Sequence, residues 1–473
     1  MDNTSPERLL ALLERQRAAF IKEMNPSAAV RDDRLARLAA MCEKHASDII
    51  EAIDADFGHR SSHETRMAEL LIVGSSARHA RRHLKGWMKT RRMPTAMHYL
   101  PASNRLMRQP LGVIGVVAPW NYPLQLALTP ALAAIAAGNR DMIKPSELTP
   151  RFAELLARIV GASFSEDELA VVTGDAQTGR AFTELPFDHL FFTGSTAVGR
   201  LVAQAAAKNL TPVTLELGGK SPAILDPSSD FAAALPRLAF GKLLNAGQTC
   251  IAPDYAFVPK DRIDAFVEEL QRAVAAMYPR LADNPDYTSI VSDRHFARLQ
   301  GLLEDARVKG ARIVSINPAG ETFDPAKRKQ APTLVLGATP EMKLMQEEIF
   351  GPILPVIGYE RLEEAIAYIN RHDRPLALYW FGSDGASRDK VLEQTISGGV
   401  TVNDCLWHIA QEDQPFGGVG ASGSGAYHGE WGFRTFSKEK PVFSQPRLSG
   451  LFLMRPPYGK TIERMLALLK RIA

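Results

Sequence analysis

Cysteine is scarce in this chain, and its spacing excludes two classes of small domain. The 473 residues contain only Cys42, Cys250 and Cys405, so the three cannot all pair within one chain, and none lies in a CxxC spacing. A disulfide-stabilised scaffold and a CxxC zinc or thiol-exchange site are therefore excluded. Unpaired cysteines are typical of a reducing compartment, and we expect a cytoplasmic protein.

The chain also lacks an excess of charge of one sign. It has 56 basic and 53 acidic side chains, for a formal net charge of +3. Proteins that bind nucleic acid concentrate positive charge on one face. We therefore expect no nucleic-acid partner.

Long uninterrupted hydrophobic runs are missing as well. The most apolar stretch, 111–138, is broken by Pro119, Asn121, Pro123 and Pro130, which favours packed strands and helices over a membrane span. The polar residues near the N-terminus interrupt any apolar core of a signal peptide. We expect neither a membrane-spanning segment nor an export signal.

What is present is a large α/β pattern. Apolar residues Leu35, Leu38, Cys42, Ala46, Ile49 and Ile53 recur at steps of three and four, which predicts one face of a helix with Cys42 in the core. Around 91–104 this pattern loosens, and we expect a β-ribbon or an arm.

Short β-branched runs alternate with helical segments through the rest of the chain. The first series predicts strands at 112–118, 142–143, 169–172 and 189–192, with helices at 124–137, 149–160, 175–183 and 196–207. A second series predicts strands at 223–225, 255–258, 312–315, 333–336, 354–357, 377–381 and 400–403, with helices at 261–276 and 361–370. Parallel strands need crossover helices, so we predict an α/β fold of two lobes with parallel sheets.

Three segments carry candidate chemistry but are ambiguous when taken alone. FTGSTAVG at 192–199 places a glycine turn at a helix start that could hold an anion, although a plain tight turn explains it too. Glu216 lies at the end of an apolar strand, where it would either pair with Lys220 or act in chemistry. Cys250 follows a glycine in a turn, and an isolated cysteine is more often inert than reactive.

The order of motifs is far more specific than any one of them. PWN at 119–121, KPSE at 144–147, FTGS at 192–195, LELGGK at 215–220, GQTC at 247–250, EEIFGP at 347–352 and PFGG at 415–418 follow one another along the chain. This order resembles the aldehyde dehydrogenase superfamily over nearly the whole sequence. The segments 100–104, 250–255, 427–429 and 433–437 are most similar to its class 3 and coniferyl aldehyde dehydrogenase group.

The resemblance implies a covalent mechanism at one thiol. Cys250 would attack the aldehyde, the Asn121 amide and the Cys250 N–H would hold the oxyanion, and Glu216 would activate the hydrolytic water. Some class 3 enzymes rely on the carboxylate at Glu348 instead, so both remain candidates. The product would be the carboxylic acid of an aromatic, phenylpropenoid or medium-chain aldehyde.

The resemblance also implies a nicotinamide cofactor, NAD with NADP possible. The residues carried over are Trp120, Lys144, Ser146, Glu147, Gly194, Ser195, Gly199, Leu217, Gly218, Glu348 and Phe350. Glu147 would repel a 2′-phosphate, which favours NAD. Asp141 departs from the family pattern, which generally has an apolar residue there.

The implied organisation has four parts. These are an NAD-binding domain of 1–87 and 109–217, a catalytic domain of 218–404, an oligomerisation arm and closing segment of 88–108 and 405–445, and an amphipathic tail of 446–473. The arm and the strand at 436–445 imply a homodimer. The tail predicts a short helix that packs on a subunit or lies on a membrane surface.

The substrate pocket and two alternatives stay open on sequence alone. Tyr122, Trp407, His408 and Phe416 are candidates for lining the substrate tunnel, although such residues also serve as ordinary packing. A thiol hydrolase would use Cys250 with His408 or His428 as the base. A non-catalytic protein of the same fold is the second alternative. No metal site is expected.

Overall fold

The first 87 residues are helical, as their apolar spacing predicts. The computed structural model describes residues 2–449, 452 and 454–472. Its N-terminal helices are α1 (Pro6–Lys22), α2 (Ala28–Lys44), α3 (Ala46–Phe57), α4 (Ser62–Thr65) and α5 (Leu71–Trp87), with a π-helical turn, η1 (Arg66–Leu70), before α5. The single helical face expected from Leu35 to Ile53 was wrong in one respect. The backbone leaves the helix at His45, and two helices share the buried apolar residues.

A six-stranded sheet forms the first lobe. Its order is β15-β7-β6-β3-β4-β5. The strands are β3 (Val113–Val117), β4 (Arg140–Lys144), β5 (Leu169–Val171), β6 (His189–Thr193), β7 (Val213–Glu216) and β15 (Gly423–Ser424). All pairs are parallel except the edge pair of β15 with β7. The alternation of strands and helices therefore predicted β3, β4, β5 and β6 and their parallel arrangement. The motif at 215–220 indicated β7, and β15 was missed.

Helices cover both faces of this sheet, and each face has its own core. One layer contains α6 (Gln125–Ala137), α7 (Pro150–Ser163), α2, α3, α5 and α16 (Gly429–Thr435), and the other contains α1, α8 (Ala176–Thr183) and α9 (Thr196–Ala207). The strand order reverses between β3 and β6. Ligands of open parallel sheets bind at such a switch point, beyond the carboxyl ends of the strands.

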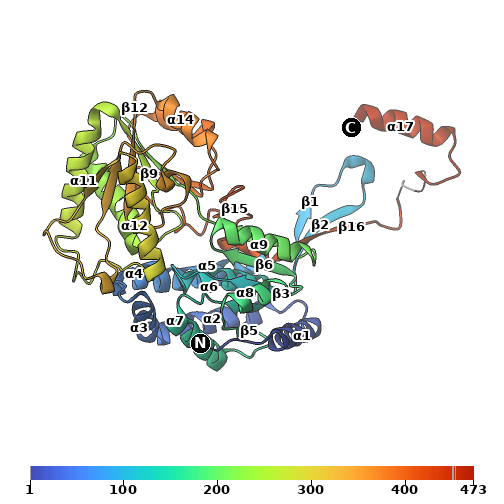
Figure 1. The fold of residues 1–473 in the computed structure, drawn as a ribbon. Coiled ribbons are helices and arrows are strands. Elements are labelled where there is room, and N and C mark those ends of the chain that lie inside the picture. Colours follow the sequence, from blue (N-terminus) through green and yellow to red (C-terminus); the bar gives the residue numbers. More distant parts are fainter. Residues whose placement is uncertain (1, 450–451, 453, 473) are drawn as a thin grey trace.

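A seven-stranded sheet forms the second lobe, in the order β10-β11-β12-β9-β8-β13-β14. Its strands are β8 (Pro222–Leu225), β9 (Tyr255–Pro259), β10 (Arg312–Ser315), β11 (Thr333–Leu336), β12 (Ile353–Tyr359), β13 (Ala377–Phe381) and β14 (Gly399–Val402). Only the edge strand β10 runs antiparallel to its neighbour. The helices are α10 (Phe231–Leu243), α11 (Ile263–Met277), α12 (Asp293–Val308), α13 (Lys343–Gln346), α14 (Leu362–Arg371) and α15 (Gly385–Gln394), with 3-10 turns η3 (Leu244–Gly247), η4 (Lys260–Arg262) and η5 (Pro325–Lys327). Figure 1 shows the two lobes joined at the level of α4 and α5.

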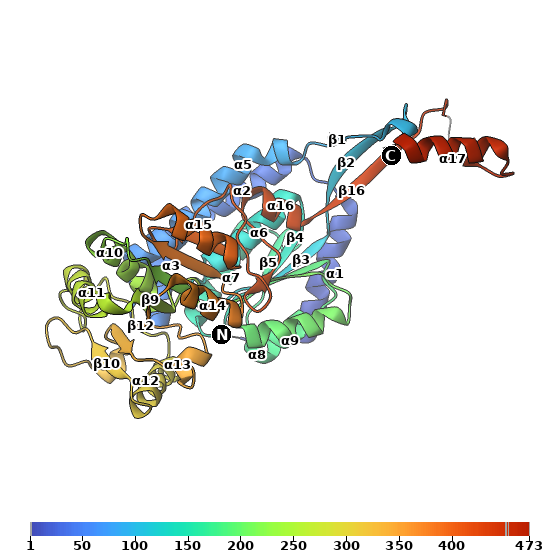
Figure 2. The same ribbon diagram turned by 90° about the horizontal axis from the view of Figure 1, so that it is seen from above.

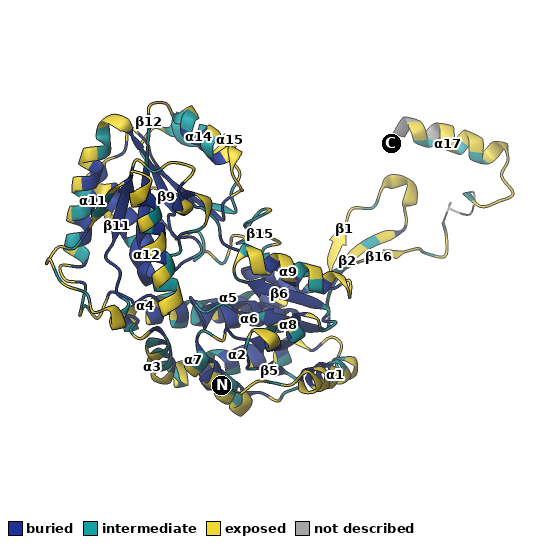
Figure 3. Cartoon of the chain, in the orientation of Figure 1, coloured by how far each residue is buried: buried dark blue, intermediate teal, exposed yellow. Residues whose placement is uncertain are grey.

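A ribbon projects from the first lobe where the sequence predicted an arm. Its strands β1 (Arg91–Met93), β2 (Ser103–Pro110) and β16 (Ser437–Ser444) are antiparallel, with the turn η2 (Met97–Tyr99) at the tip. Figure 2 shows the ribbon and the terminal helix α17 (Lys460–Ile472) extending away from both lobes. Figure 3 shows the contrast in burial, since the lobes have buried centres and the ribbon is largely exposed.

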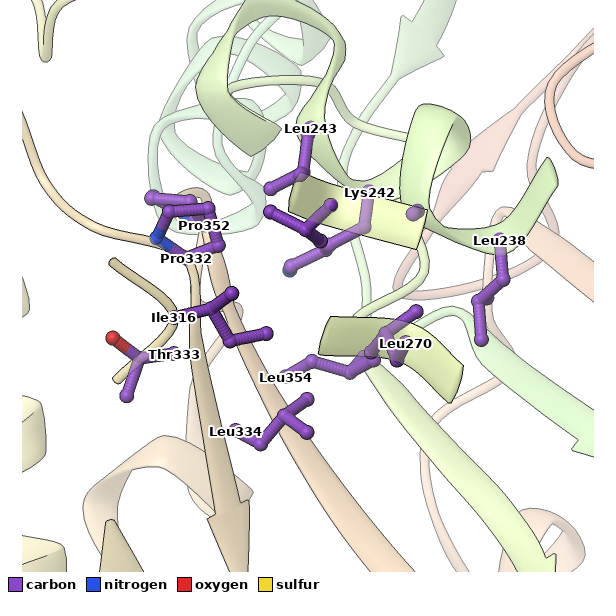
Figure 4. Close-up of a pocket in the computed structure, with 12 residues that line it drawn as sticks. Leu238, Lys242, Leu243, Leu270, Ile316, Pro332, Thr333, Leu334, Pro352 and Leu354 are labelled. Carbon is purple, nitrogen blue, oxygen red and sulfur yellow. The ribbon is translucent and has the colours of Figure 1, made fainter. Parts of the chain in front are cut away.

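The core of the second lobe leaves one small apolar cavity between its sheet and two helices. Its volume is about 20 Å³, and side chains of α10, α11, β11 and β12 line it (Figure 4). Burial lowers the pKa of the Lys242 amine beside it to about 8. The cavity is roughly one water in size, so it is a packing gap and has no room for an organic ligand.

Across the described part of the chain, no helix combines the length and the apolar character that crossing a bilayer requires.

Candidate active site

A large cavity lies between the two lobes, at the switch point of the first sheet. Its volume is about 770 Å³, within the usual range for small-molecule and cofactor sites. Ten of the predicted residues line it: Trp120, Asn121, Gly194, Ser195, Glu216, Leu217, Gly218, Cys250, Glu348 and Phe350. Segments far apart in sequence thus converge on one space.

Cys250 reaches this cavity on the loop between α10 and β9. The other two cysteines are buried, whereas Cys250 is partly exposed. Burial, together with the nearby carboxylates of Glu348 and Glu216, raises the pKa of its thiol to about 12. The backbone N–H groups of Cys250 and Ile251 oppose this shift because they face the thiolate. A nucleophilic thiolate here needs a neighbouring base to take its proton.

Asn121 follows β3 and is held on both its backbone and its side chain. Its amide Nδ2 donates to the Gln248 carbonyl at 3.1 Å, two residues before Cys250. A side-chain amide carries two N–H donors. One proton therefore fixes the amide to the loop 244–250, which carries the candidate nucleophile and is called the nucleophile loop below. The other proton is available to an oxyanion in the cavity.

Glu216 ends β7 and is almost completely buried, with 3% of its surface exposed. Neither carboxylate oxygen has a hydrogen-bond partner among the described residues, and burial raises its pKa well above the ordinary value. The alternative of an ion pair with Lys220 was wrong. The Lys220 amine instead pairs with Asp254 and donates to the Leu344 carbonyl at 2.8 Å.

Glu348 enters the cavity from the loop before β12. Its carboxylate lies against Gly218, where a β-carbon would overlap it, so this strand end requires glycine. Burial raises the pKa of Glu348 to about 8, Asp254 adds to the shift, and the Gly219 N–H opposes it. Unlike Glu216, this carboxylate therefore has a backbone donor.

The start of α9 faces the cavity at the carboxyl end of β6. Ser195 caps the helix by accepting from the Val198 N–H at 3.4 Å, and Thr196 and Ala197 line the cavity with it. The free N–H groups of a first helical turn suit an anion such as a diphosphate. Gly199 does not line the cavity. It lets α9 approach Leu217, whose Cδ2 would lie 2.6 Å from a β-carbon at position 199.

Lys144 ends β4, and Ser146 and Glu147 follow it; none of the three lines this cavity. Lys144 is buried, and its amine lies 3.5 Å from the Glu147 carboxylate. Because β4 is the parallel neighbour of β3, these side chains lie at the same edge of the sheet as the cavity. Burial lowers the pKa of Lys144, and Glu147 opposes that shift.

The four residues predicted for the substrate tunnel do not line the cavity that contains Cys250. Tyr122 is buried beneath the nucleophile loop, with its hydroxyl 2.6 Å from the Thr249 hydroxyl. His408 and Phe416 stack with their ring centres 6.0 Å apart. Trp407 remains 45% exposed and stacks on Phe240. Their assignment to the substrate tunnel stays a prediction.

The sequence reasoning missed other residues at the cavity. His295, Arg298 and Arg374 line it from the second lobe, and His295 meets Trp120 edge-to-face at 5.0 Å. Arg298 donates to the Glu348 carbonyl at 3.2 Å and so supports the EEIFGP loop. No motif contains these three residues. Basic residues outside motifs usually face solvent, so nothing in the sequence placed them at a cavity.

Fold and site together define a class of protein. Two α/β lobes enclose a cavity in which a thiol, a side-chain amide and two carboxylates lie opposite a helix N-terminus. The model of the family described as "Aldehyde dehydrogenase family" matches residues 3–442. The chain belongs to the aldehyde dehydrogenase family.

Individual relatives show which members of the family this chain is similar to. The "Probable coniferyl aldehyde dehydrogenase" of Pseudomonas aeruginosa is 52% identical over 458 residues, 97% of this chain and 95% of that protein. A solved structure of Staphylococcus aureus AldH in a substrate-bound state has a TM-score of 0.92 at 38% identity, with 98% of this chain and 99% of that chain covered. An aldehyde dehydrogenase of Mycobacterium tuberculosis complexed with NAD+ has a TM-score of 0.84 at 29% identity, covering 94% and 91%.

Proposed function

We propose that this aldehyde dehydrogenase oxidises a phenylpropenoid aldehyde of the coniferyl type to its acid, with NAD as the hydride acceptor and Cys250 as the nucleophile. The observation that carries the proposal is the convergence of Cys250, Asn121 and Glu216 on one cavity. The substrate class rests on the name of the Pseudomonas aeruginosa relative. The cofactor class rests on the family, whose members use NAD or NADP.

The residues present fit a dinucleotide. The start of α9 offers backbone donors, and the Thr193 hydroxyl at the same strand end is buried without a hydrogen-bond partner among the described residues. In the proposal Gly194 and Ser195 hold the diphosphate, and Lys144 and Glu147 hold the adenosine ribose. Glu147 would repel a 2′-phosphate, which supports NAD over NADP. When bound, the cofactor supplies the acceptor for the hydride that leaves the aldehyde carbon.

The protein's own groups supply the remaining chemistry. A carboxylate takes the proton of Cys250, and the thiolate sulfur bonds to the aldehyde carbon while the carbonyl π electrons move to oxygen. Asn121 Nδ2 and the Cys250 N–H hold that oxyanion. Loss of hydride from carbon leaves a thioester. A water that gives its proton to Glu216 then attacks the thioester and releases the acid and the thiolate.

We propose Glu216 rather than Glu348 as the base for hydrolysis. Neither Glu216 oxygen has a hydrogen-bond partner among the described residues, and burial raises its pKa, so its ionised form is a stronger base toward water than an ordinary carboxylate. The Glu348 carboxylate receives the Gly219 N–H and lies against Gly218. That contact fits a role in taking the thiol proton or in holding the nicotinamide ribose.

The ribbon supports a homodimer as part of the proposal. Its apolar side chains Met93, Met97, Tyr99, Leu100 and Phe443 are exposed, and an exposed strand edge is a template for pairing with another chain. The two unpaired, buried cysteines suit the reducing cytoplasm.

A kinetic panel tests the function directly. Coniferyl aldehyde, benzaldehyde and hexanal would each be mixed with the protein and NAD or NADP while reduced nicotinamide is followed by absorbance. The expected result is the highest kcat/KM for coniferyl aldehyde with NAD. Ester cleavage without cofactor reduction would favour the thiol hydrolase, and a lack of any turnover with bound cofactor would favour a non-catalytic protein.

A further inference from the structure

Three ionisable side chains of the N-terminal helical region are buried directly beneath the active site. Arg60, Glu64 and Glu69 each expose 6% of their surface or less, although none of them lines the cavity. Charged groups are rarely buried unless they are paired, because desolvation costs several kcal/mol per ion. Their partners therefore show what this cluster holds in place.

Arg60 holds the backbone of Asn121. Its Nη1 donates to the Asn121 carbonyl at 3.0 Å and lies 2.8 Å from a Glu69 carboxylate oxygen. The guanidinium carbon also lies over the rings of Phe57 and Tyr122, 5.0 and 4.9 Å from their centres. Ring faces attract a cation, so the two rings and the contacts of Nη1 hold the guanidinium, while its buried Nε and Nη2 have no hydrogen-bond partner among the described residues.

Glu69 holds the segment that follows Asn121, at the point where α6 begins. Its Oε2 accepts from the N–H groups of Leu124 and Gln125, at 2.6 and 3.1 Å, where α6 begins. Glu69 belongs to the π-helical turn η1, and such turns occur frequently at functional sites. The segment 121–125, which carries the oxyanion donor, is thus held by an arginine and a glutamate from one neighbouring segment.

Glu64 holds the other half of the site, the nucleophile loop. Its Oε1 accepts from the Asn245 N–H at 3.0 Å, and its Oε2 accepts from the Thr288 hydroxyl at 2.6 Å. Asn245 then donates through Nδ2 to the carbonyls of Asn121 and Gln248, both at 3.1 Å. Asn245 therefore bridges the segment 121–125, which carries the oxyanion donor, and the nucleophile loop that ends in Cys250.

The nucleophile loop needs such support because its backbone is strained. Asn245, Ala246 and Gly247 have φ values of 54°, 52° and 75°. A non-glycine residue in the left-handed region is strained and persists only where the surroundings impose it. The hydrogen bond from Asn245 to Glu64 is one such constraint, and it acts five residues before the thiol.

We infer that Arg60 and Glu64 are positioning residues, which together set the distance between the Cys250 thiol and the Asn121 oxyanion donor. The inference rests on the proposed function of these two groups. No residue of 60–69 lines the cavity. These residues act by joining the first lobe, through Asn121 and α6, to the second lobe, through Asn245 and Thr288.

The test compares four variants of the full-length protein. Glu64→Gln replaces one acceptor oxygen with an amide NH2 group, which then faces one of the two existing donors. Thr288→Val removes one hydrogen bond at nearly constant volume, and Thr288→Ser restores that hydroxyl. Arg81→Gln, at an exposed ion pair with Asp32, is the matched control. For each variant the NAD dissociation constant and the thermal midpoint of unfolding are measured. The kinetic measurements are the first-order rate constant of the NADH burst and the rate at which iodoacetamide alkylates Cys250.

The expected result is a change in rate at constant cofactor affinity. Misplacing a catalytic donor by about 1 Å costs about a hundredfold, so Glu64→Gln should slow the burst about ten- to a hundredfold. Thr288→Val should slow it roughly three- to tenfold, Thr288→Ser should restore it, and NAD affinity should stay within about twofold. If Glu64→Gln does not fold, the pair of Thr288 variants decides the question.

Two other outcomes separate the inference from the proposed function. Wild-type burst and alkylation rates in Glu64→Gln and Thr288→Val, with only a lower thermal midpoint, would show that the cluster stabilises the fold and positions nothing. A wild-type protein that oxidises no aldehyde would contradict the proposed function. In that case the alkylation rates of Cys250 would still decide the inference, because they need no substrate turnover.

Discussion

Buried carboxylates occur in two regions of this protein, and the regions treat them differently. Beneath the active site, Glu64 and Glu69 together accept four hydrogen bonds, and the remaining Glu69 oxygen lies 2.8 Å from Arg60 Nη1 in an ion pair. At the cavity wall, Glu216 accepts no hydrogen bond from the described residues. A buried carboxylate with partners can hold loops in place, whereas one without partners costs stability and, at a cavity, is a candidate for chemistry.

The largest effect is expected at the thiol. Cys250→Ala should reduce aldehyde oxidation by more than about a hundredfold, because no other described thiol is exposed. NAD should still bind, since the start of α9 is intact. Steady-state oxidation and cofactor titration check this, and residual turnover above about one per cent would count against covalent catalysis.

Glu216→Gln should separate hydride transfer from hydrolysis. The burst of NADH should persist while steady-state turnover falls about a hundred- to ten thousandfold, because the thioester lacks its base. The same variant should unfold at a higher temperature, since an unpaired carboxylate becomes a neutral amide. Stopped-flow absorbance and thermal denaturation measure the two effects. Unchanged steady-state turnover would transfer the role of base to Glu348.

The pH dependence of the burst rate should report the ionisation of Glu348, the second carboxylate at the cavity. Burial raises the pKa of Glu348 to about 8 and that of the Cys250 thiol to about 12. The unprotonated base forms as the pH rises, so the burst rate should increase from pH 6 to pH 9. In Glu348→Gln this rise should weaken or move. A burst rate that is flat over this range in the wild type would contradict a role for Glu348 as the base that takes the thiol proton.

The smallest effect is expected at Asp141, a buried carboxylate of β4 that does not line the cavity. Neither of its oxygens has a hydrogen-bond partner among the described residues, and burial raises its pKa well above the ordinary value. The folded state therefore binds a proton that the unfolded state releases near pH 4. Its contribution to stability is present below that pH and is lost as the pH rises toward the folded-state pKa.

Asp141→Asn should remove this dependence. At pH 8 the variant should be more stable than the wild type by about 1–3 kcal/mol, the cost of an unsatisfied buried group, and the difference should shrink toward pH 4. Aldehyde oxidation should not change. Thermal denaturation between pH 4 and pH 9 measures this, and an equal or lower midpoint at pH 8 would show that Asp141 has a partner in solution.

The sequence predicted most of the fold because both lobes depend on local pattern. The β-branched runs at 189–192 and 255–258 became β6 and β9 with shifts of one residue at an end. The break at His45 was not predictable from apolar spacing, which continues across it. The edge strand β15 was also missed, because two residues carry no periodic signal and pair only through tertiary contact with β7.

The candidate site was predictable where motifs carry it and not elsewhere. The glycines and polar residues at 119–121, 193–195 and 216–218 follow strands, and the carboxyl ends of parallel strands share one edge. Tyr122 and Phe416, predicted for the substrate tunnel from their residue type, do not line the cavity that contains Cys250, and residue type alone does not say which space an aromatic ring faces. The partner of Lys220 was missed for a similar reason, since Asp254 is 34 residues away.

By itself, the amino-acid sequence determined the family, the two series of strands and helices, and the candidate reactive groups, because these depend on local periodicity and on motif order. Only the tertiary structure decided which buried charges are satisfied. Arg60 and Glu64 look like ordinary polar positions of a helical segment. Their partners Asn121 and Asn245 come within 3.0 Å of them only after both lobes have folded against that segment.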